Sequence, residues 1–249
     1  MRLRMIVGLL VGLIGSIAWG VDHARFDALL KKHVDADGLV DYKALARDAA
    51  DLDAYLAQLA AVDLPALGRD EQLALLMNAY NAFTLRLMLD YPHVASIKDI
   101  PEDQRWKAAR WKLAGKLVSL DQIEHEMIRP GYDEPRIHFA LVCAAVACPP
   151  LRAEAYVADR LDEQLDDQMK FTHAGDRRAR WVVYTPGADS IRLTKLYQWY
   201  GKDFAPDQAG VLRYLAKYIP GLEPEKIRTV EWLDYDWSLN SQENRAKLS

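Results

Sequence analysis

The stretch "DEQLALLMNAYNAFTLRLMLDYP" (Asp70–Pro92) decides the fold of this chain, because it has the strongest helical periodicity in the sequence. Nearly every position from 73 to 89 is apolar, a pattern typical of a helix that is buried on all sides. Two acidic residues stand in its first turn, where they interact favourably with the helix dipole, and a proline closes it. We therefore expect a long, fully buried helix.

Asn78 and Asn81 interrupt this apolar pattern, and at a spacing of three residues they share one face of the helix. A buried amide costs about 1–3 kcal/mol when its donors and acceptors are unpaired, so both side chains must be bonded. Two interpretations are open. The amides line a site, where one orients a catalytic group or donates to a developing oxyanion, or they hold the backbone of a neighbouring loop.

Short strand pairs are expected elsewhere along the chain. "WKLAGKLVSL" (Trp111–Leu120) indicates two strands about a turn at Ala114–Gly115, after which Ser119 caps a helix with Gln122 in capping-box position. A second hairpin is predicted around Pro186–Gly187. A final strand and loop are predicted at 227–240, and a frayed end at 241–249.

Helices dominate the rest of the pattern. They are predicted at 22–34, 41–62, 120–129, 159–173, 195–204 and 208–219. The sequence has no internal repeat and no low-complexity linker. The fold class is therefore α+β: one mostly helical domain over residues 21–249, with short antiparallel strand pairs.

The first twenty residues have the pattern of a secretory signal. Arg2 and Arg4 precede the uncharged apolar run "MIVGLLVGLIGSIAW" (Met5–Trp19), and Ala18 and Gly20 are small residues at the two positions that signal peptidase reads. The run is shorter than a membrane span of about 20 residues. We expect a Sec-type signal peptide, cleavage near Gly20, and a periplasmic or secreted protein without a later membrane span. An uncleaved anchor is the alternative.

The composition and the motifs argue against several classes of partner and cofactor. The chain has 32 basic and 36 acidic residues, a net charge of −4, whereas nucleic-acid binding needs a basic surface. The sequence has no Gly-rich phosphate loop, dinucleotide fingerprint or standard metal motif, so no cofactor and no metal are expected. We expect a small-molecule or peptide ligand, and no nucleic acid.

A second stretch, "RIHFALVCAAVACPPLR" (Arg136–Arg152), holds both cysteines of the chain and His138. In an oxidising compartment a disulfide between Cys143 and Cys148 is the default expectation. Within one helix their Cα atoms would be farther apart than the about 4.4–6.8 Å that a disulfide spans, whereas in a loop they can bridge. Such a bridge either holds the loop or is redox-active.

The alternative is a reactive thiol at Cys143 with a histidine as its partner. His138 and Cys143 are five residues apart, so they face different sides of a regular strand or helix. A direct pair therefore requires the element to break between them, and otherwise His125 is the next candidate base. An imidazolium beside Cys143 would stabilise the thiolate and lower the pKa of the thiol.

Two further candidates carry less weight. Asp236, in "LDYDWSLN" (Leu233–Asn240), either accepts local backbone hydrogen bonds or orients a catalytic histidine. A zinc site made from His125, His138 and the two cysteines can be drawn, but their spacing fits no standard zinc pattern.

Five segments, taken in order, resemble the domain-of-unknown-function family 547. They are "LLMNAYNAFTLRLML", "WKLAGKLVSLDQIEHEMIR", "RIHFALVCAAVACPPLR", "LYQWYGKDF" and "LDYDWSLN", and they span about residues 70–240. The resemblance implies an exported or envelope protein in many cases, with no settled activity. The family's characteristic residues correspond to Asn78, Tyr80, Asn81, His138, Cys143, Cys148, Pro149, Asp236, Trp237 and Asn240. Val142 and Ala147 depart from the asparagine and serine that are common in the family.

Two hypotheses about function are open. The first is a cysteine hydrolase or acyltransferase that acts on peptide or amide bonds. Cys143 is then the nucleophile and His138 or His125 the base, while Asn78 or Asn81 orients the base or donates to the oxyanion. The second is a non-enzymatic binding or accessory protein of the envelope, in which a Cys143–Cys148 disulfide holds a loop.

Export can be tested directly. N-terminal sequencing of the soluble protein from its native host should begin near Val21, because signal peptidase would have removed residues 1–20. Recovery of an intact Met1 in the soluble fraction would contradict the prediction.

Overall fold

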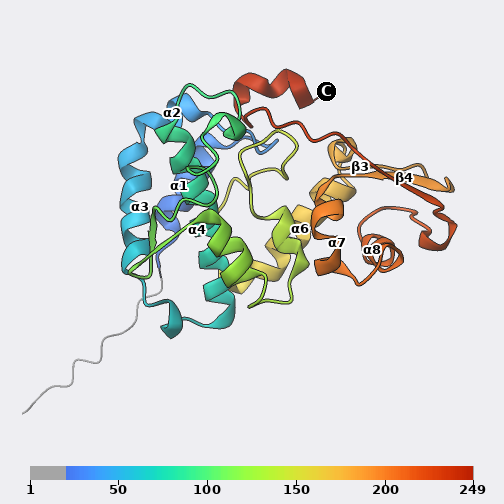
Figure 1. The fold of residues 1–249 in the computed structure, drawn as a ribbon, viewed down its shortest axis with the longest axis horizontal. Helices are drawn as coiled ribbons and strands as arrows, with labels where there is room; N and C mark the ends of the chain where they lie inside the picture. The colour runs from blue at the N-terminus through green and yellow to red at the C-terminus, as the bar shows by residue number, and fades with distance from the viewer. Residues whose placement is uncertain (1–20, 249) are drawn as a thin grey trace, which may run out of the picture.

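Helix α4 (Arg69–Asp90) is the centre of the first of two hydrophobic clusters, as its apolar sequence predicts. The computed structural model describes residues 21–248. Every residue of α4 from Leu73 to Leu85 is buried. Figure 1 shows α4 inside the larger, mostly helical part of the molecule, with the first three helices beside it.

These three helices are α1 (Ala24–His33), α2 (Tyr42–Arg47) and α3 (Ala49–Ala61). The single helix predicted at 41–62 is thus two, and Asp48 stands at the break between them. The Asp48 carboxylate accepts a hydrogen bond from Nε2 of the buried His33 at 2.7 Å. Contact with α1 therefore stabilises the end of α2.

The hairpin of β1 (Trp111–Leu113) and β2 (Lys116–Val118) forms as predicted. Its turn residues Ala114 and Gly115 have φ angles of +49° and +78°. Their N–H groups donate to the carbonyls of Leu59 and Ala60, at 3.0 and 2.8 Å. Because the last carbonyls of a helix lack partners within it, the hairpin turn caps the C-terminus of α3.

The helix after Ser119 begins as predicted and then changes type. Ser119 Oγ accepts from the N–H of Gln122, and Gln122 Oε1 accepts from the N–H of Ser119, both at 3.0 Å. The first turn, α5 (Leu120–Gln122), continues as a π-helix over Ile123–Ile128. Such wider turns often occur at functional sites.

The second hydrophobic cluster combines a small sheet with three helices. The helices are α6 (Leu161–His173), α7 (Leu196–Phe204) and α8 (Gln208–Leu215). The predicted antiparallel hairpin is β3 (Val182–Val183) and β4 (Ser190–Leu193), and β5 (Thr229–Trp232) adds to β4 in parallel. This sheet is therefore mixed, because α7 and α8 form the long crossover that parallel neighbours need. The class, mostly helical α+β, is confirmed.

The stretch with the cysteines is neither a strand nor a continuous helix. A 3₁₀ helix over Pro135–Phe139 ends just after His138, and the chain then runs irregularly through residues 140–149, here called the cysteine loop. Ala144 has a φ of +62°, a left-handed conformation that costs a non-glycine residue about 1–2 kcal/mol. The break that a His138–Cys143 pair requires is therefore present.

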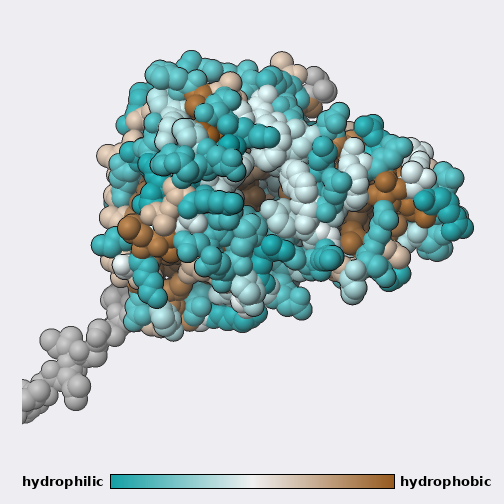
Figure 2. Space-filling view, viewed as in Figure 1, coloured by the Kyte–Doolittle hydropathy of each residue, from teal (hydrophilic) through white to brown (hydrophobic). Residues whose placement is uncertain are grey.

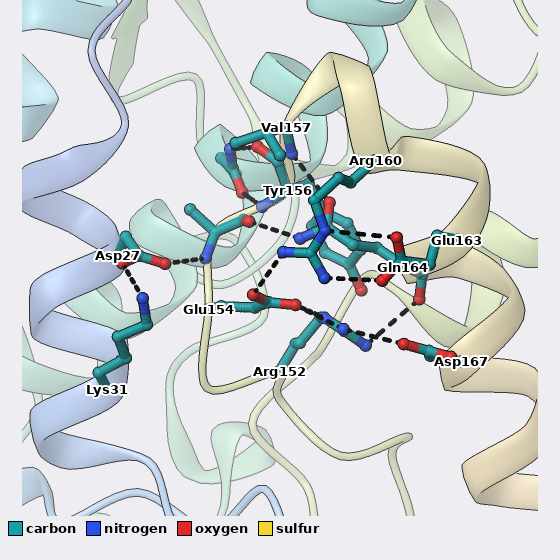
Figure 3. Close-up of polar contacts among 12 residues, drawn as sticks. Asp27, Lys31, Arg152, Glu154, Tyr156, Val157, Arg160, Glu163, Gln164 and Asp167 are labelled. Carbon is teal, nitrogen blue, oxygen red and sulfur yellow. Dashed lines mark hydrogen bonds and ion pairs between the residues drawn. The ribbon is translucent and has the colours of Figure 1, made fainter.

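The segment after the cysteine loop is anchored by α1 and α6 (Figure 3). Gln164 of α6 accepts from the N–H of Val157 at 2.9 Å and donates to the carbonyl of Ala155 at 2.8 Å. Asp27 of α1 accepts from the N–H of Ala155 at 3.1 Å. Ion pairs between Glu154 and two arginines lie beside these bonds. The cysteine loop therefore ends in a fixed segment.

The C-terminal segment packs against the first cluster instead of fraying. Leu239 pairs with Ala145 of the cysteine loop in an isolated bridge, and a 3₁₀ helix follows over Gln242–Leu248. Arg245 forms ion pairs with Asp35 and Asp37, near the start of the chain. The predicted fraying is therefore wrong for residues 241–248.

The predicted signal peptide at residues 1–20 lies outside the described residues. Within residues 21–248, none of the helices combines the length and the apolar composition that crossing a bilayer requires.

Asn78 and Asn81 hold the backbone of two neighbouring segments. Asn81 Nδ2 donates to the carbonyl of Ala140 at 2.9 Å, and its Oδ1 accepts from the N–H of Val142 at 3.0 Å. Asn78 binds the carbonyl and the N–H of Tyr156 in the same way, at 2.8 and 2.9 Å. This geometry agrees with the interpretation that the two amides hold neighbouring backbone.

Removal of the Asn81 amide should therefore destabilise the fold. We expect Asn81→Ala to lower the free energy of unfolding by about 1–3 kcal/mol, because buried backbone groups of Ala140 and Val142 lose their partner. Thr84→Val is a matched control, since the buried Thr84 hydroxyl of the same helix has no hydrogen-bond partner within residues 21–248. Urea denaturation measures both variants. Equal midpoints for Asn81→Ala and the wild type would contradict the prediction.

Candidate functional site

A cavity of about 260 Å³ lies where the two hydrophobic clusters meet. Its wall is formed by α4, the π-helix, the cysteine loop, α7 and the segment after β5. Figure 2 shows apolar surface recessed near the middle of the molecule, between the larger helical part and the α7–α8 part. The aromatic lining is Tyr80, Trp106, Trp199, Tyr200, Tyr235 and Trp237, and the other chemically active lining residues are Asp121, Glu124, His125, His138, Cys143 and Cys148.

Cys143 and Cys148 form a disulfide in the cavity wall, with their Cα atoms 6.4 Å apart. Cys148 is buried, whereas Cys143 is partly exposed. Cys148 Sγ accepts hydrogen bonds from the N–H of Cys143 at 3.1 Å and from the hydroxyl of Tyr235 at 3.2 Å. The loop-bridging disulfide expected from the sequence is therefore present. The reactive thiol at Cys143 stays a prediction about the reduced protein.

The imidazole of His138 is held by a carboxylate. Its Nε2–H donates to Asp203 Oδ2 at 2.7 Å, and Tyr200 stacks on the ring at a centroid distance of 4.0 Å. Because Nε2 carries the shared proton, Nδ1 is the nitrogen left to accept another. Burial lowers the pKa of His138 to about 4, and the Asp203 hydrogen bond offsets only part of this effect. The ring is therefore neutral at pH 7, not the imidazolium that would stabilise a thiolate.

Arg129 fixes the orientation of Asp203 through two hydrogen bonds. Its Nε donates to Asp203 Oδ2 at 2.6 Å and its Nη2 to Oδ1 at 2.8 Å. The Arg129 hydrogen bond, aided by His138, lowers the pKa of the Asp203 carboxyl to about 2 against the effect of partial burial. Such paired guanidinium–carboxylate contacts define orientation as well as charge. Arg129, Asp203 and His138 thus form one chain of hydrogen bonds between the π-helix region and α7.

Glu124 provides a buried carboxyl on the other side of His138. Its Oε1 lies 3.9 Å from His138 Nδ1, beyond hydrogen-bond distance, and Tyr200 is a further polar neighbour of this carboxyl. Burial raises the pKa of Glu124, so this carboxyl holds a proton more readily than an exposed one. The free nitrogen of His138 therefore lies near a buried carboxyl group without a direct hydrogen bond to it.

His125, the second candidate base, also lines the cavity but is more exposed. Its Nδ1 accepts a hydrogen bond from Arg129 Nη1 at 3.2 Å, and its Nε2 lies 3.7 Å from Asp121 Oδ1. The side chain is 34 % exposed, against 2 % for His138. Of the two, His138 has the fixed orientation that a catalytic base needs.

Three other sequence-predicted residues lie away from the cavity lining. The amides of Asn78 and Asn81 are bonded to backbone, as described above. Asp236 accepts from the N–H of Ser238 at 2.8 Å, which is the local role considered for it. The orientation of a histidine, predicted as a possible role of Asp236, is performed by Asp203.

Sequence reasoning missed Glu124, Tyr200, Asp203 and Tyr235. Tyr200 and Asp203 are three residues apart in "LYQWYGKDF", so a helix presents both on one face, and this spacing was the available signal. Glu124 precedes the candidate His125 directly. Nothing in "LDYDWSLN" distinguishes Tyr235, whose hydroxyl contacts the disulfide, from Asp236.

The zinc site drawn from the sequence can be compared with the structure. Within residues 21–248, no group of three or more His, Cys, Asp or Glu side chains is placed to hold a metal ion. The two sulfurs of the zinc site considered above are bonded to each other.

Fold and site together define a mostly helical α+β protein with a disulfide in the wall of an aromatic and acidic cavity. The model of the family described as "Protein of unknown function, DUF547" matches residues 64–171, which confirms the resemblance predicted from the motifs. No curated protein and no solved structure gives a significant match to the chain. The matched range includes Glu124, His138 and both cysteines, whereas Tyr200, Asp203 and Tyr235 lie beyond it.

The protonation state of His138 can be measured by NMR of the ¹⁵N-labelled imidazole. We expect a neutral ring with its proton on Nε2 at pH 6, and protonation only as the pH falls towards about 4. The unfolded chain takes up this proton near 6.5. The contribution of His138 to stability is therefore full above pH 6.5 and is lost between about 6.5 and 4. An imidazolium at pH 6 would contradict the prediction.

Proposed function

We propose that this protein is a thiol-dependent hydrolase or acyltransferase acting on amide bonds. Cys143 is the nucleophile and His138 the base, and Asp203 is a positioning residue that acts through His138. One observation carries the proposal: Asp203 holds the Nε2–H of a neutral imidazole in the same cavity that contains the Cys143 sulfur. A nucleophile, a base and a group that orients the base are the recurring parts of such sites.

The active form in this proposal is the reduced one. A thiolate of an external dithiol attacks Cys143 Sγ, the more exposed sulfur, and the disulfide breaks with Cys148 leaving as a thiolate. The second thiol of the reductant then attacks the mixed disulfide, which frees Cys143 and leaves the reductant as a disulfide. Cys148 is a favourable leaving group, because Tyr235 and the N–H of Cys143 donate to its sulfur.

In the reaction itself, the thiol proton of Cys143 passes to His138 Nδ1 while the sulfur attacks the carbonyl carbon. The amine leaves with a proton returned by the imidazolium, and the acyl group remains on sulfur as a thioester. Water, or an acceptor amine, then attacks the thioester as His138 again takes the proton. The acyl–sulfur bond breaks, the acyl product leaves, and the imidazolium returns the proton to the Cys143 sulfur. A histidine that is neutral at pH 7 is in the correct state to begin this sequence.

A second candidate function rests on the disulfide. A bridged loop beside an aromatic cavity is also a stable ligand-binding site, and the bridge together with the Asn81 clamp fixes this loop at both ends. In this alternative the protein binds a small molecule or peptide in the envelope without chemical change.

We also propose that the protein is exported to the periplasm or secreted. The signal pattern of residues 1–20 supports this, and a disulfide agrees with an oxidising compartment. A reductant must then reach the site in that compartment.

Alkylation of the reduced protein distinguishes the two functions. After reduction with a phosphine, iodoacetamide at pH 7 should modify Cys143 well before Cys148, because Cys143 is more exposed and lines the same cavity as the proposed base His138. His138→Asn and Asp203→Asn should slow the labelling of Cys143 by at least about tenfold, since a general base typically contributes about 10²–10⁴-fold. Peptide mass spectrometry over time gives the rates.

His93→Asn is the control, because His93 is an exposed histidine outside the cavity lining. Cys143 of this control variant should be labelled at the wild-type rate. Circular dichroism should show that all three variants are folded. In Asp203→Asn, the pH dependence of the Cys143 labelling rate should also change. A merely structural role of Asp203 would not cause this change. Equal rates in the wild type and His138→Asn would remove the enzyme proposal and leave the binding function.

A further inference from the structure

Four aromatic side chains that line the cavity also contact one another. The ring centroids of Trp199 and Tyr235 are 4.9 Å apart, and those of Tyr235 and Trp237 are 4.6 Å apart. Trp106 lies 6.0 Å from Trp237 on the other side. The centroids of Trp199 and Trp237 are 6.1 Å apart, so Trp199, Tyr235 and Trp237 form a compact cluster that Trp106 extends. We call these four residues the aromatic wall.

The charged groups of the lining favour a cation. Asp121 and Glu124 supply carboxyl groups, and no lysine or arginine from residues 21–248 is among the lining residues. Burial disfavours the ionised form of the Glu124 carboxyl, and a positive charge in the cavity would offset this cost. Aromatic faces carry negative electrostatic potential and attract cations in the same way.

Two cations of the protein already contact the aromatic wall. Lys98 Nζ lies 4.8 Å from the ring centroid of Trp237, and the Arg105 guanidinium lies 5.2 Å from that of Trp106. Neither Lys98 nor Arg105 is among the residues that line the cavity. The same rings line the cavity, where aromatic faces can attract a further cation.

We infer that the cavity binds a small organic cation, an ammonium or trimethylammonium group, between the aromatic wall and the two carboxyl groups. A volume of about 260 Å³ is just below the range of about 300–1,000 Å³ that is usual for ligand sites. The cavity therefore has room for one such group. As an extension that rests on the proposed function, the cation is the part of an acyl substrate that directs its carbonyl to Cys143.

The test compares choline with 3,3-dimethylbutan-1-ol, a neutral molecule of nearly the same shape. Both are titrated into the full, disulfide-intact protein at pH 7, and binding is followed by tryptophan fluorescence and by calorimetry. We expect choline to bind at least about tenfold more tightly, because one desolvated cation–π contact is worth a difference of this size. Equal affinities would show an apolar cavity without preference for charge and would overturn the inference. Absence of choline binding would overturn it as well.

Variants of the aromatic wall locate the binding. Trp237→Leu should weaken choline binding by about tenfold, and Trp237→Phe, which retains a ring, should restore part of it. Trp232→Leu is the matched control, because Trp232 lies on β5 outside the cavity lining, and choline affinity should be unchanged. Thermal melts establish that each variant is folded. A choline affinity that is the same in Trp237→Leu and the wild type would overturn the assignment to this cavity.

The outcome is independent of the thiol chemistry, since the titration uses the oxidised protein. Choline binding without His138-dependent labelling of Cys143 would remove the proposed enzyme and keep the cation site. His138-dependent labelling without a preference for choline would remove the cation site and keep the enzyme.

Discussion

The pair of hydrogen bonds from Asn81 to the backbone of residues 140–142 is the interaction on which the site depends. A loop inside a protein must pair its own N–H and carbonyl groups, and here a side chain on the buried helix α4 takes the place of a neighbouring strand. The cysteine loop is therefore free to leave regular structure immediately after His138. Without this break, His138 and Cys143 would face different sides of one element.

A second constraint links the two hydrophobic clusters through charge. Arg129 follows the π-helix of the first cluster, Asp203 lies on α7 of the second, and His138 stands between them. The guanidinium keeps Asp203 ionised, and burial keeps His138 neutral, so the chain of hydrogen bonds has one stable arrangement of protons. The family match ends at residue 171. The carboxylate that orients His138 is thus contributed by a part of the chain beyond the matched range.

The sequence predicts those features that local pattern determines. α4 follows from its apolar run, the β1–β2 hairpin from the turn at Ala114–Gly115, and the start of α5 from the Ser119 capping box. The five-residue spacing of His138 and Cys143 also predicts that the two can pair only if the element breaks between them. The structure contains this break.

The remaining features depend on contacts between distant parts of the chain. Asp203 is 65 residues from His138, and no local pattern connects them. The ion pairs of Arg245 with Asp35 and Asp37 hold a segment whose composition is that of a frayed end. Likewise, the parallel pairing of β5 with β4 follows from the crossover through α7 and α8, which periodicity alone does not reveal. In the same way, only the folded structure shows that the Tyr235 side chain contacts the disulfide and that the neighbouring Asp236 side chain does not.

The central claim is that reduction leaves the sulfur of Cys143 beside the free nitrogen of His138. A crystal structure of the reduced protein measures this directly, through the distance between Cys143 Sγ and His138 Nδ1. We expect these two atoms to form a hydrogen bond, with Asp203 still bonded to Nε2. A sulfur that turns away from the imidazole, with the ring nitrogen engaged by Glu124 alone, would contradict it.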